Sequence, residues 1–322
     1  MKKLISLILV AVMAVSMLSV SAFAEEQSFK IAIVQQLDHP SLDEIRIACD
    51  ARLKELAEEK GFSVEVKDFH GQNDNTVLNQ IGAQVVDDGY DAIIPIATLA
   101  AICMATATEE TQTPVIYAAI SDPESAGLTG LSRVTGTSDA LNTPFVLDMM
   151  LAVQPDIKTV GLLYSTSEDN SAAAIAQAKQ YLDSKGIACL EATGTKSDEI
   201  IDAAQSLVGA VDAVFTPTDN TVMAVEGRVA EILTEAGIPH YAGADSFVKS
   251  GAFATCGVNY TELGGATADM ALGILQGGEV PAYRLMDGGI ITVNTEAAQA
   301  LGLSYGVYSS MANTVVEVTT QG

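Results

Sequence analysis

The segment Lys30-Ile-Ala-Ile-Val34 near the start of the chain has a counterpart in the middle of the sequence, Lys158-Thr-Val-Gly-Leu-Leu-Tyr164. Both are short, apolar and rich in β-branched residues. Segments further along the chain are repeated as well. Lys60-Gly61 and Lys185-Gly186 each precede an apolar run, and they are 125 residues apart. A long period that occurs only twice indicates two homologous lobes rather than a solenoid. Matched lobes leave a cleft between them, and we expect the ligand site there.

Strand and helix patterns alternate through both halves of the chain. The strand-like runs lack strict polar–apolar alternation, which is typical of parallel strands buried on both faces. Strands that alternate with helices form right-handed βαβ units, so we expect an α/β fold of two doubly wound parallel-sheet lobes. The expected strands lie at about 29–35, 62–68, 91–96, 114–119, 158–164, 187–192, 211–216 and 238–242, and the expected helices at about 41–60, 75–88, 99–110, 171–185, 197–208 and 221–236.

The last part of the chain departs from this repeat. An extended piece at 255–260 precedes a helix at about 262–275, and another at 290–294 precedes a short helix that ends at Leu301-Gly302. These leftover elements indicate that the chain crosses between the lobes more than once. The alternative, two independent domains on one linker, leaves them unexplained.

Three crossings are expected, near 136–139, 257–259 and 286–289. Three segments at one hinge let two rigid lobes rotate against each other. The expected lobes are residues 28–137 plus 260–286 and residues 138–259 plus 287–304.

The first 24 residues have the features of an export signal. Lys2 and Lys3 precede an apolar stretch from Leu4 to Val20, and Ala22-Phe-Ala24 is a small-x-small cleavage site. The alternative is a transmembrane anchor, because the apolar run is nearly long enough to span a bilayer. The cleavage site favours a signal peptide at 1–24 and an extracytoplasmic protein, periplasmic or secreted. No Cys stands near the cleavage site, so the sequence does not support a lipid anchor.

The acidic composition limits the class of partner. The net charge is −25, and loss of residues 1–24, with two lysines and no acid, makes it −27. Such a charge disfavours nucleic acid, because phosphate contacts need clustered Lys and Arg. It disfavours anionic lipid as well. Solubility outside the cell is the simplest reason for this charge, and we expect a monomer that does not insert into the membrane.

The four cysteines are widely spaced, without a C-x-x-C pair or a His at ligand spacing. A zinc site is therefore not expected, and the sequence predicts neither a metal nor a cofactor. Each cysteine falls in an apolar helix or strand pattern, which favours buried free thiols over disulfides. They are Cys49, Cys103, Cys189 and Cys256.

Polar residues gather where the expected strands end, and the ligand crevice of an open parallel sheet lies beyond those ends. The simplest role for any one of them is to cap the next helix. Several together, beside free helix N-terminal amides, suit an anion such as a carboxylate. Thr98 with the following amides and Ser165 to Ser167 are the carboxylate candidates, and Asp219 or Asp245 could pair with an ammonium. The candidate ligand-binding residues are Gln35, His39, Thr98, Ala100, Ser121, Asp122, Ser138, Tyr164, Ser165, Ser167, Asn170, Asp219, Asn220, Asp245 and Tyr260.

The sequence lacks the common catalytic motifs: there is no G-x-S-x-G elbow, P-loop or H-E-x-x-H. His39, Asp122 and Ser165 could be drawn together as a hydrolase triad, but their spacing does not demand it. His240 falls within an expected strand, where a core or hinge role is more common. These observations favour a binding protein over an enzyme.

Several of these segments together resemble the periplasmic-binding-protein-like substrate-binding components of ABC transporters, of the tryptophan/tyrosine-type branch. The specific part is Pro217-Thr-Asp-Asn-Thr-Val222 with Gly257-Val-Asn-Tyr-Thr-Glu-Leu-Gly264, whereas the Thr-x-Ala-Ala segment at 98–101 is weak by itself. The other segments, which extend the resemblance over almost the whole mature chain, are 35–43, 121–123, 136–139, 164–168 and 245–246.

The resemblance implies a type I binding-protein fold that closes on a small amino acid-like ligand, with aromatic amino acids among the candidates. It also implies delivery of the ligand to a membrane permease driven by an ATPase. Two features depart from relatives of this kind: there is no lipobox Cys, and there is no Trp, so an aromatic ligand would pack against Tyr, Phe or His. The alternative function is an exported ligand sensor that signals to a membrane receptor kinase.

Overall fold

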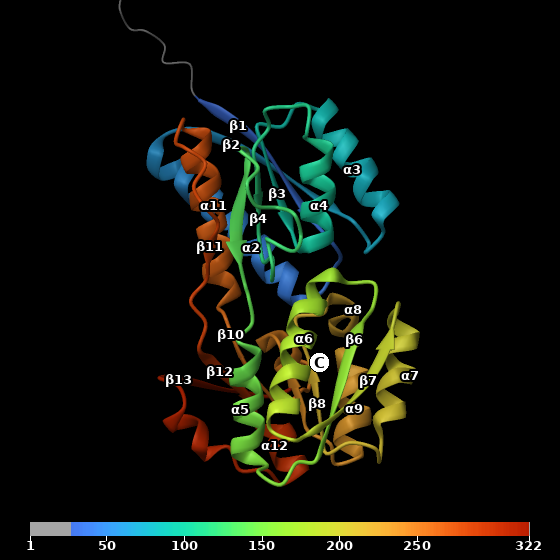
Figure 1. Ribbon diagram of the computed structural model, residues 1–322. Coiled ribbons are helices and arrows are strands. Elements are labelled where there is room, and N and C mark those ends of the chain that lie inside the picture. Colours follow the sequence, from blue (N-terminus) through green and yellow to red (C-terminus); the bar gives the residue numbers. More distant parts are fainter. Residues whose placement is uncertain (1–26, 322) are drawn as a thin grey trace, which may run out of the picture.

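The structure, a computed structural model, describes residues 27–321. The export signal expected at 1–24 lies outside the described residues. Two sheets with helices packed around them form two lobes, one above the other in Figure 1. Among residues 27–321, no helix is both long and apolar enough to cross a membrane. The α/β architecture with two doubly wound sheets is confirmed.

The first lobe contains a parallel six-stranded sheet in the order β11-β5-β4-β3-β1-β2. Ile31 and Ile33 of β1 point to one face and belong to the core with α2 and α11. Ala32 and Val34 point to the other face and belong to the core with α3 and α4. Its strands are β1 (Ser28–Gln35), β2 (Ser63–His70), β3 (Ala92–Ile96), β4 (Val115–Tyr117), β5 (Val134–Ser138) and β11 (Arg284–Leu285), and its helices are α2 (Pro40–Lys60), α3 (Asn75–Asp87), α4 (Thr98–Ala107) and α11 (Tyr260–Leu275).

The second lobe contains a seven-stranded sheet in the order β13-β12-β10-β9-β8-β6-β7. All its pairs are parallel except β10 with β12. Its strands are β6 (Thr159–Ser165), β7 (Ala188–Gly194), β8 (Ala213–Thr216), β9 (His240–Ala242), β10 (Ala254–Gly257), β12 (Ile290–Asn294) and β13 (Thr314–Val318). Its helices are α5 (Thr143–Val153), α6 (Asp169–Ser184), α7 (Ser197–Leu207), α8 (Asn220–Met223), α9 (Glu226–Glu235), α10 (Asp245–Lys249), α12 (Thr295–Leu301) and the 3-10 helix Gly306–Ser310.

The chain passes between the two sheets three times, from β5 to α5, from β10 to α11 and from β11 to β12. The strands at these crossings lie toward one side of their sheets. The strands β2 and β7 form the opposite edges. The three connections therefore lie together at one side of the molecule, on the left in Figure 1.

Several elements differ from the sequence-based expectation. The helix expected at 221–236 is broken into α8 and α9, because Val225 leaves the helical conformation (φ −127°, ψ 14°). The strands β5 and β13 and the helices α5 and α10 were not expected. The expectation that all four thiols are buried is wrong for Cys189, which lies exposed on the edge strand β7, whereas the other three are buried.

Close packing of α11 on α2 depends on one glycine. A Cβ atom at Gly264 would lie 2.6 Å from the backbone oxygen of Ile45 and 2.9 Å from the Cβ of Ala48. The next residue, Gly265, has no atom within 4 Å of the same position. The two glycines are adjacent in α11 and differ in their surroundings: α2 packs against Gly264, whereas no atom packs against the Cβ position of Gly265.

We expect Gly264→Ala to lower the free energy of unfolding by about 1–3 kcal/mol, because the added methyl must push the two helices apart. Gly265→Ala should raise it by up to about 1 kcal/mol, since alanine favours the helix more than glycine does. Urea unfolding of the two variants measures the difference. Equal effects would contradict the close approach of the two helices.

Candidate functional site

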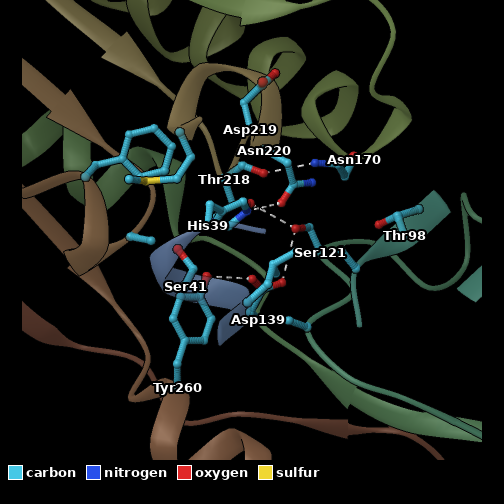
Figure 2. Close-up of a pocket in the computed structure, with 16 residues that line it drawn as sticks. His39, Ser41, Thr98, Ser121, Asp139, Asn170, Thr218, Asp219, Asn220 and Tyr260 are labelled. Carbon is cyan, nitrogen blue, oxygen red and sulfur yellow. Dashed lines mark hydrogen bonds between the residues drawn. The ribbon is translucent and has the colours of Figure 1, made fainter. Parts of the chain in front are cut away.

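A cavity lies between the lobes, at the carboxyl ends of strands from both sheets (Figure 2). Its volume is only about 20 Å³, the scale of single water molecules, whereas small-molecule sites usually measure about 300 Å³ or more. The walls of the two lobes must therefore separate before a larger molecule can enter.

Hydrogen bonds join the two lobes directly across this cavity. Ser121 and Thr218 share a hydrogen bond between their hydroxyl oxygens, 3.0 Å apart. The Nε2 atom of His39 lies 3.0 Å from Oδ1 of Asn220, and Ser41 bonds Ser246. The lobes are thus closed against each other in this structure.

Two alanines that line the cavity have strained backbones. Ala97, at the end of β3, has φ 75° and ψ 163°, and Ala119, after β4, has φ 57°. Non-glycine residues in such regions cost about 1–3 kcal/mol each and cluster at functional sites. The turn at Ala97 starts α4 at the cavity wall, so that Thr98 and the positive end of the helix dipole border the cavity.

The matching helix start in the second lobe, that of α8, is occupied by the chain itself. Glu168 accepts hydrogen bonds from the backbone N–H groups of Asn220 (3.1 Å) and Thr221 (2.7 Å). It also accepts from both of their side chains and from Asn170 Nδ2. Burial, reinforced by the neighbouring Asp219, raises the pKa of the Glu168 carboxyl. At the start of α4, by contrast, the N–H of Leu99 donates to the neutral amide oxygen of Gln36 (3.0 Å). Because an internal carboxylate fills the start of α8 and no carboxylate is bonded at the start of α4 among the described residues, the start of α4 is the better place for an anionic ligand group.

The carboxylate that faces the cavity is Asp139, which directly follows β5. It is 6% exposed and accepts hydrogen bonds from Ser121 Oγ (3.1 Å) and Tyr260 OH (3.0 Å), both visible in Figure 2. Burial raises the pKa of Asp139, and the two hydroxyl bonds partly offset that rise. No cationic side chain balances this carboxylate among the residues that line the cavity, all of which lie in the described part of the chain.

Comparison with known proteins gives the family. The sequence profile of the family described as ABC transporter substrate binding protein matches residues 30–312. The chain belongs to this family. Its members are generally binding proteins rather than enzymes, and they work outside the cytoplasm. The resemblance seen in the sequence is confirmed.

Individual relatives are similar over nearly the whole binding protein. The tyrosine-binding protein of Clostridioides difficile (strain R20291) is 31% identical, over 94% of this chain and 93% of the relative. The structure of an ABC domain in complex with L-Trp from Streptococcus pneumonia has a TM-score of 0.82 at 29% identity, covering 90% of this chain and 100% of that one. The ligand-free, open structure of a substrate binding protein with adhesive properties from Clostridium difficile has a TM-score of 0.68 at 32% identity, covering 91% and 100%. This binding protein therefore overlays better on the L-Trp complex than on the open structure.

About half of the residues predicted for the site line the cavity. They are His39, Thr98, Ser121, Asn170, Asp219, Asn220 and Tyr260. The cavity also brings in residues outside the predicted set: Ser41, Leu42, Ala97, Ala119, Asp139, Thr218, Met223, Ala244 and Phe247. The sequence carries a signal for Asp139, which ends the segment 136–139. That segment indicates a crossing between the lobes, and its pattern does not show that it is also a strand that ends at the cavity.

Asp219 and Asp245, the predicted ammonium partners, are engaged elsewhere. One Asp219 oxygen accepts from Ser165 N (2.7 Å) and Ser171 Oγ (2.7 Å), and the other accepts from Val222 N (3.0 Å), so this side chain caps α8. Asp245 lies outside the cavity. One of its oxygens pairs with Lys249 at 2.6 Å, and the other is buried without a partner among the described residues. Their carboxylates are therefore less available to an ammonium than that of Asp139.

The other predicted residues lie behind or beside the cavity. Gln35 is fully buried and bonds Leu37 O, and Ala100 is buried within α4. The hydroxyl of Tyr164 donates to Glu191 at 2.7 Å, away from the cavity. Ser165 and Ser167 bond each other. Asp122 and Ser138 border a separate groove of about 340 Å³ that adjoins the cavity.

Proposed function

We propose that this substrate-binding protein is the receptor of an ABC importer and that it binds an amino acid in the cavity between its lobes. The observation that carries the proposal is the pairing of opposite polarities in one cavity: the start of α4 at Thr98 and the buried carboxylate of Asp139. The first suits the carboxylate of the ligand and the second its ammonium. An amino acid carries both groups.

The apolar part of the cavity would hold the side chain of the ligand. Leu42 from the first lobe and Met223 and Phe247 from the second lobe line it. The tyrosine-binding relative and the L-Trp complex support an aromatic amino acid. Met223 adds a flexible side chain that adapts to ligands of different shape.

Binding would be coupled to movement about the three connections. We infer that the two lobes, one built on each sheet, open at the side of β2 and β7. They then admit the amino acid and close on it. Closure excludes water from the charged contacts and forms a surface that includes both lobes. A membrane permease with its ATPase would receive the amino acid from this closed form outside the cytoplasm.

A thermal-shift and calorimetric screen of the protein without its first 24 residues tests the proposal. We expect one or more of L-Tyr, L-Trp, L-Phe and L-Leu to raise the melting temperature in a saturable manner, because a ligand that binds only the folded protein stabilises it by about 2.7 kcal/mol at a concentration of 100 Kd. Sugars serve as the control. A rise with a sugar and with none of the amino acids would contradict the proposal.

A further inference from the structure

His39 has one ring nitrogen that lacks a partner. The side chain is 6% exposed and lines the cavity, and its Nε2 atom is bonded to Asn220. Within residues 27–321, its Nδ1 atom is buried without any hydrogen-bond partner. A buried polar atom without a partner costs free energy that a ligand could recover.

The neighbouring contacts decide whether this nitrogen is a donor or an acceptor. The Nδ2 group of Asn220 donates to Glu168 Oε2 at 2.7 Å, so the amide oxygen of Asn220 is the atom that faces His39. An amide oxygen can only accept, which requires the hydrogen to sit on Nε2 of His39. Burial lowers the pKa of His39 and so favours the neutral ring. In the neutral ring with Nε2 protonated, Nδ1 is a bare acceptor.

The position of His39 places this acceptor beside the apolar part of the cavity. His39 directly precedes α2 in an extended conformation (φ −162°, ψ 161°), and its side chain and that of Leu42, in the first turn of α2, both line the cavity. The facing wall includes Phe247, whose ring packs edge-on against His240 with centroids 6.5 Å apart. A side chain lying between Leu42 and Phe247 would therefore pass close to the imidazole of His39.

We propose that Nδ1 of His39 accepts a hydrogen bond from the ring of an aromatic ligand and makes this binding protein selective for rings that carry an O–H or N–H group. This inference rests on the proposed function. Phenol and indole side chains satisfy the acceptor, whereas the phenyl ring of phenylalanine leaves it unpaired. A site with a buried hydrogen-bonding group discriminates strongly against a ligand that lacks the matching group.

Calorimetric titration with L-Tyr, L-Trp, L-Phe and L-Leu tests this selectivity on the unaltered protein. We expect L-Tyr or L-Trp to bind more tightly than L-Phe by about tenfold or more, because the complex with L-Phe leaves one buried acceptor unpaired. In His39→Phe that preference should fall to about threefold or less. Loss of the bond between His39 and Asn220 weakens closure for all four amino acids alike, so the ratio of the Kd values is the quantity that tests the inference. His70→Phe makes the same substitution at an exposed histidine on β2 and should retain the preference of the unaltered protein.

Equal affinities for L-Tyr, L-Trp and L-Phe in the unaltered protein would overturn the inference. An equal loss of affinity for L-Leu and L-Tyr in His39→Phe would show that His39 acts through closure of the lobes or through groups shared by all amino acids, and not through the ring of the ligand. In ¹⁵N NMR we expect the neutral Nε2–H form of His39, and a doubly protonated ring would overturn the inference without any variant. If the unaltered protein bound no amino acid at all, the proposed function would fall and this inference with it.

Discussion

Asp139→Asn is expected to weaken amino-acid binding by about 2–5 kcal/mol, roughly 30-fold or more, because truncating one partner of a buried charge pair has costs of this size. The substitution keeps the shape of the side chain and removes its charge. Titration calorimetry with the amino acid that binds the unaltered protein most tightly measures the loss. The matched control is Asp122→Asn, since Asp122 bonds only within its own turn, to Ser125. An equal loss in both variants would contradict the assignment of the ammonium to Asp139.

The same carboxylate predicts how binding depends on pH. Burial raises the pKa of Asp139, so the group loses its charge at a higher pH than an exposed aspartate does. Affinity should therefore fall as the pH drops through this raised pKa. Burial also raises the pKa of Glu168 and Asp219, and Asp139→Asn separates their effects: its weaker binding should show less dependence on pH than that of the unaltered protein.

His240→Leu is expected to cause a large loss of stability, about 3–5 kcal/mol, because it leaves a buried carboxylate without its partner. His240 and Glu226 are 2% and 1% exposed, and their nearest nitrogen and oxygen atoms are 2.9 Å apart. The second oxygen of Glu226 is buried without a partner among the described residues. Urea unfolding measures the change in the free energy of unfolding.

The double variant Glu226→Leu/His240→Leu is the control for this pair. Removal of both polar groups at once should restore part of the stability lost in the single variant, since apolar side chains can replace a buried ion pair. A double variant that is less stable than His240→Leu would contradict this, because it would show that Glu226 stabilises the lobe even without His240.

The framework of the fold could be predicted from the sequence because it depends on local patterns. The first strand of each half and the long helix after it appear close to their expected positions, at Ser28–Gln35 with Pro40–Lys60 and at Thr159–Ser165 with Asp169–Ser184. Apolar, β-branched runs and glycine stops are sufficient to place such elements. The strand β5 was not expected, because Val134–Ser138 is short and largely polar although all five residues are buried.

The site was only partly predictable because its chemistry depends on contacts between distant residues. Asp219 and Asp139 both follow strands, and sequence position alone does not separate them. The carboxylate of Asp219 is engaged by Ser165 and Ser171, about 50 residues earlier in the chain. Asp139 instead faces the cavity, where Tyr260, 121 residues later in the chain, meets it. Helix patterns also could not show that Glu168 occupies the start of α8.

The most direct test of the account is the distance between the two lobes with and without an amino acid. Cys189 on β7 is exposed and the other three cysteines are buried, so a spin label can be attached there and paired with one at Glu65→Cys on the exposed face of β2. Pulsed electron paramagnetic resonance then measures the separation of the edges opposite the three connections. We predict a shorter and narrower distance distribution when the tightest-binding amino acid is added. An unchanged distribution at a saturating concentration of that amino acid would contradict closure of the lobes on the ligand.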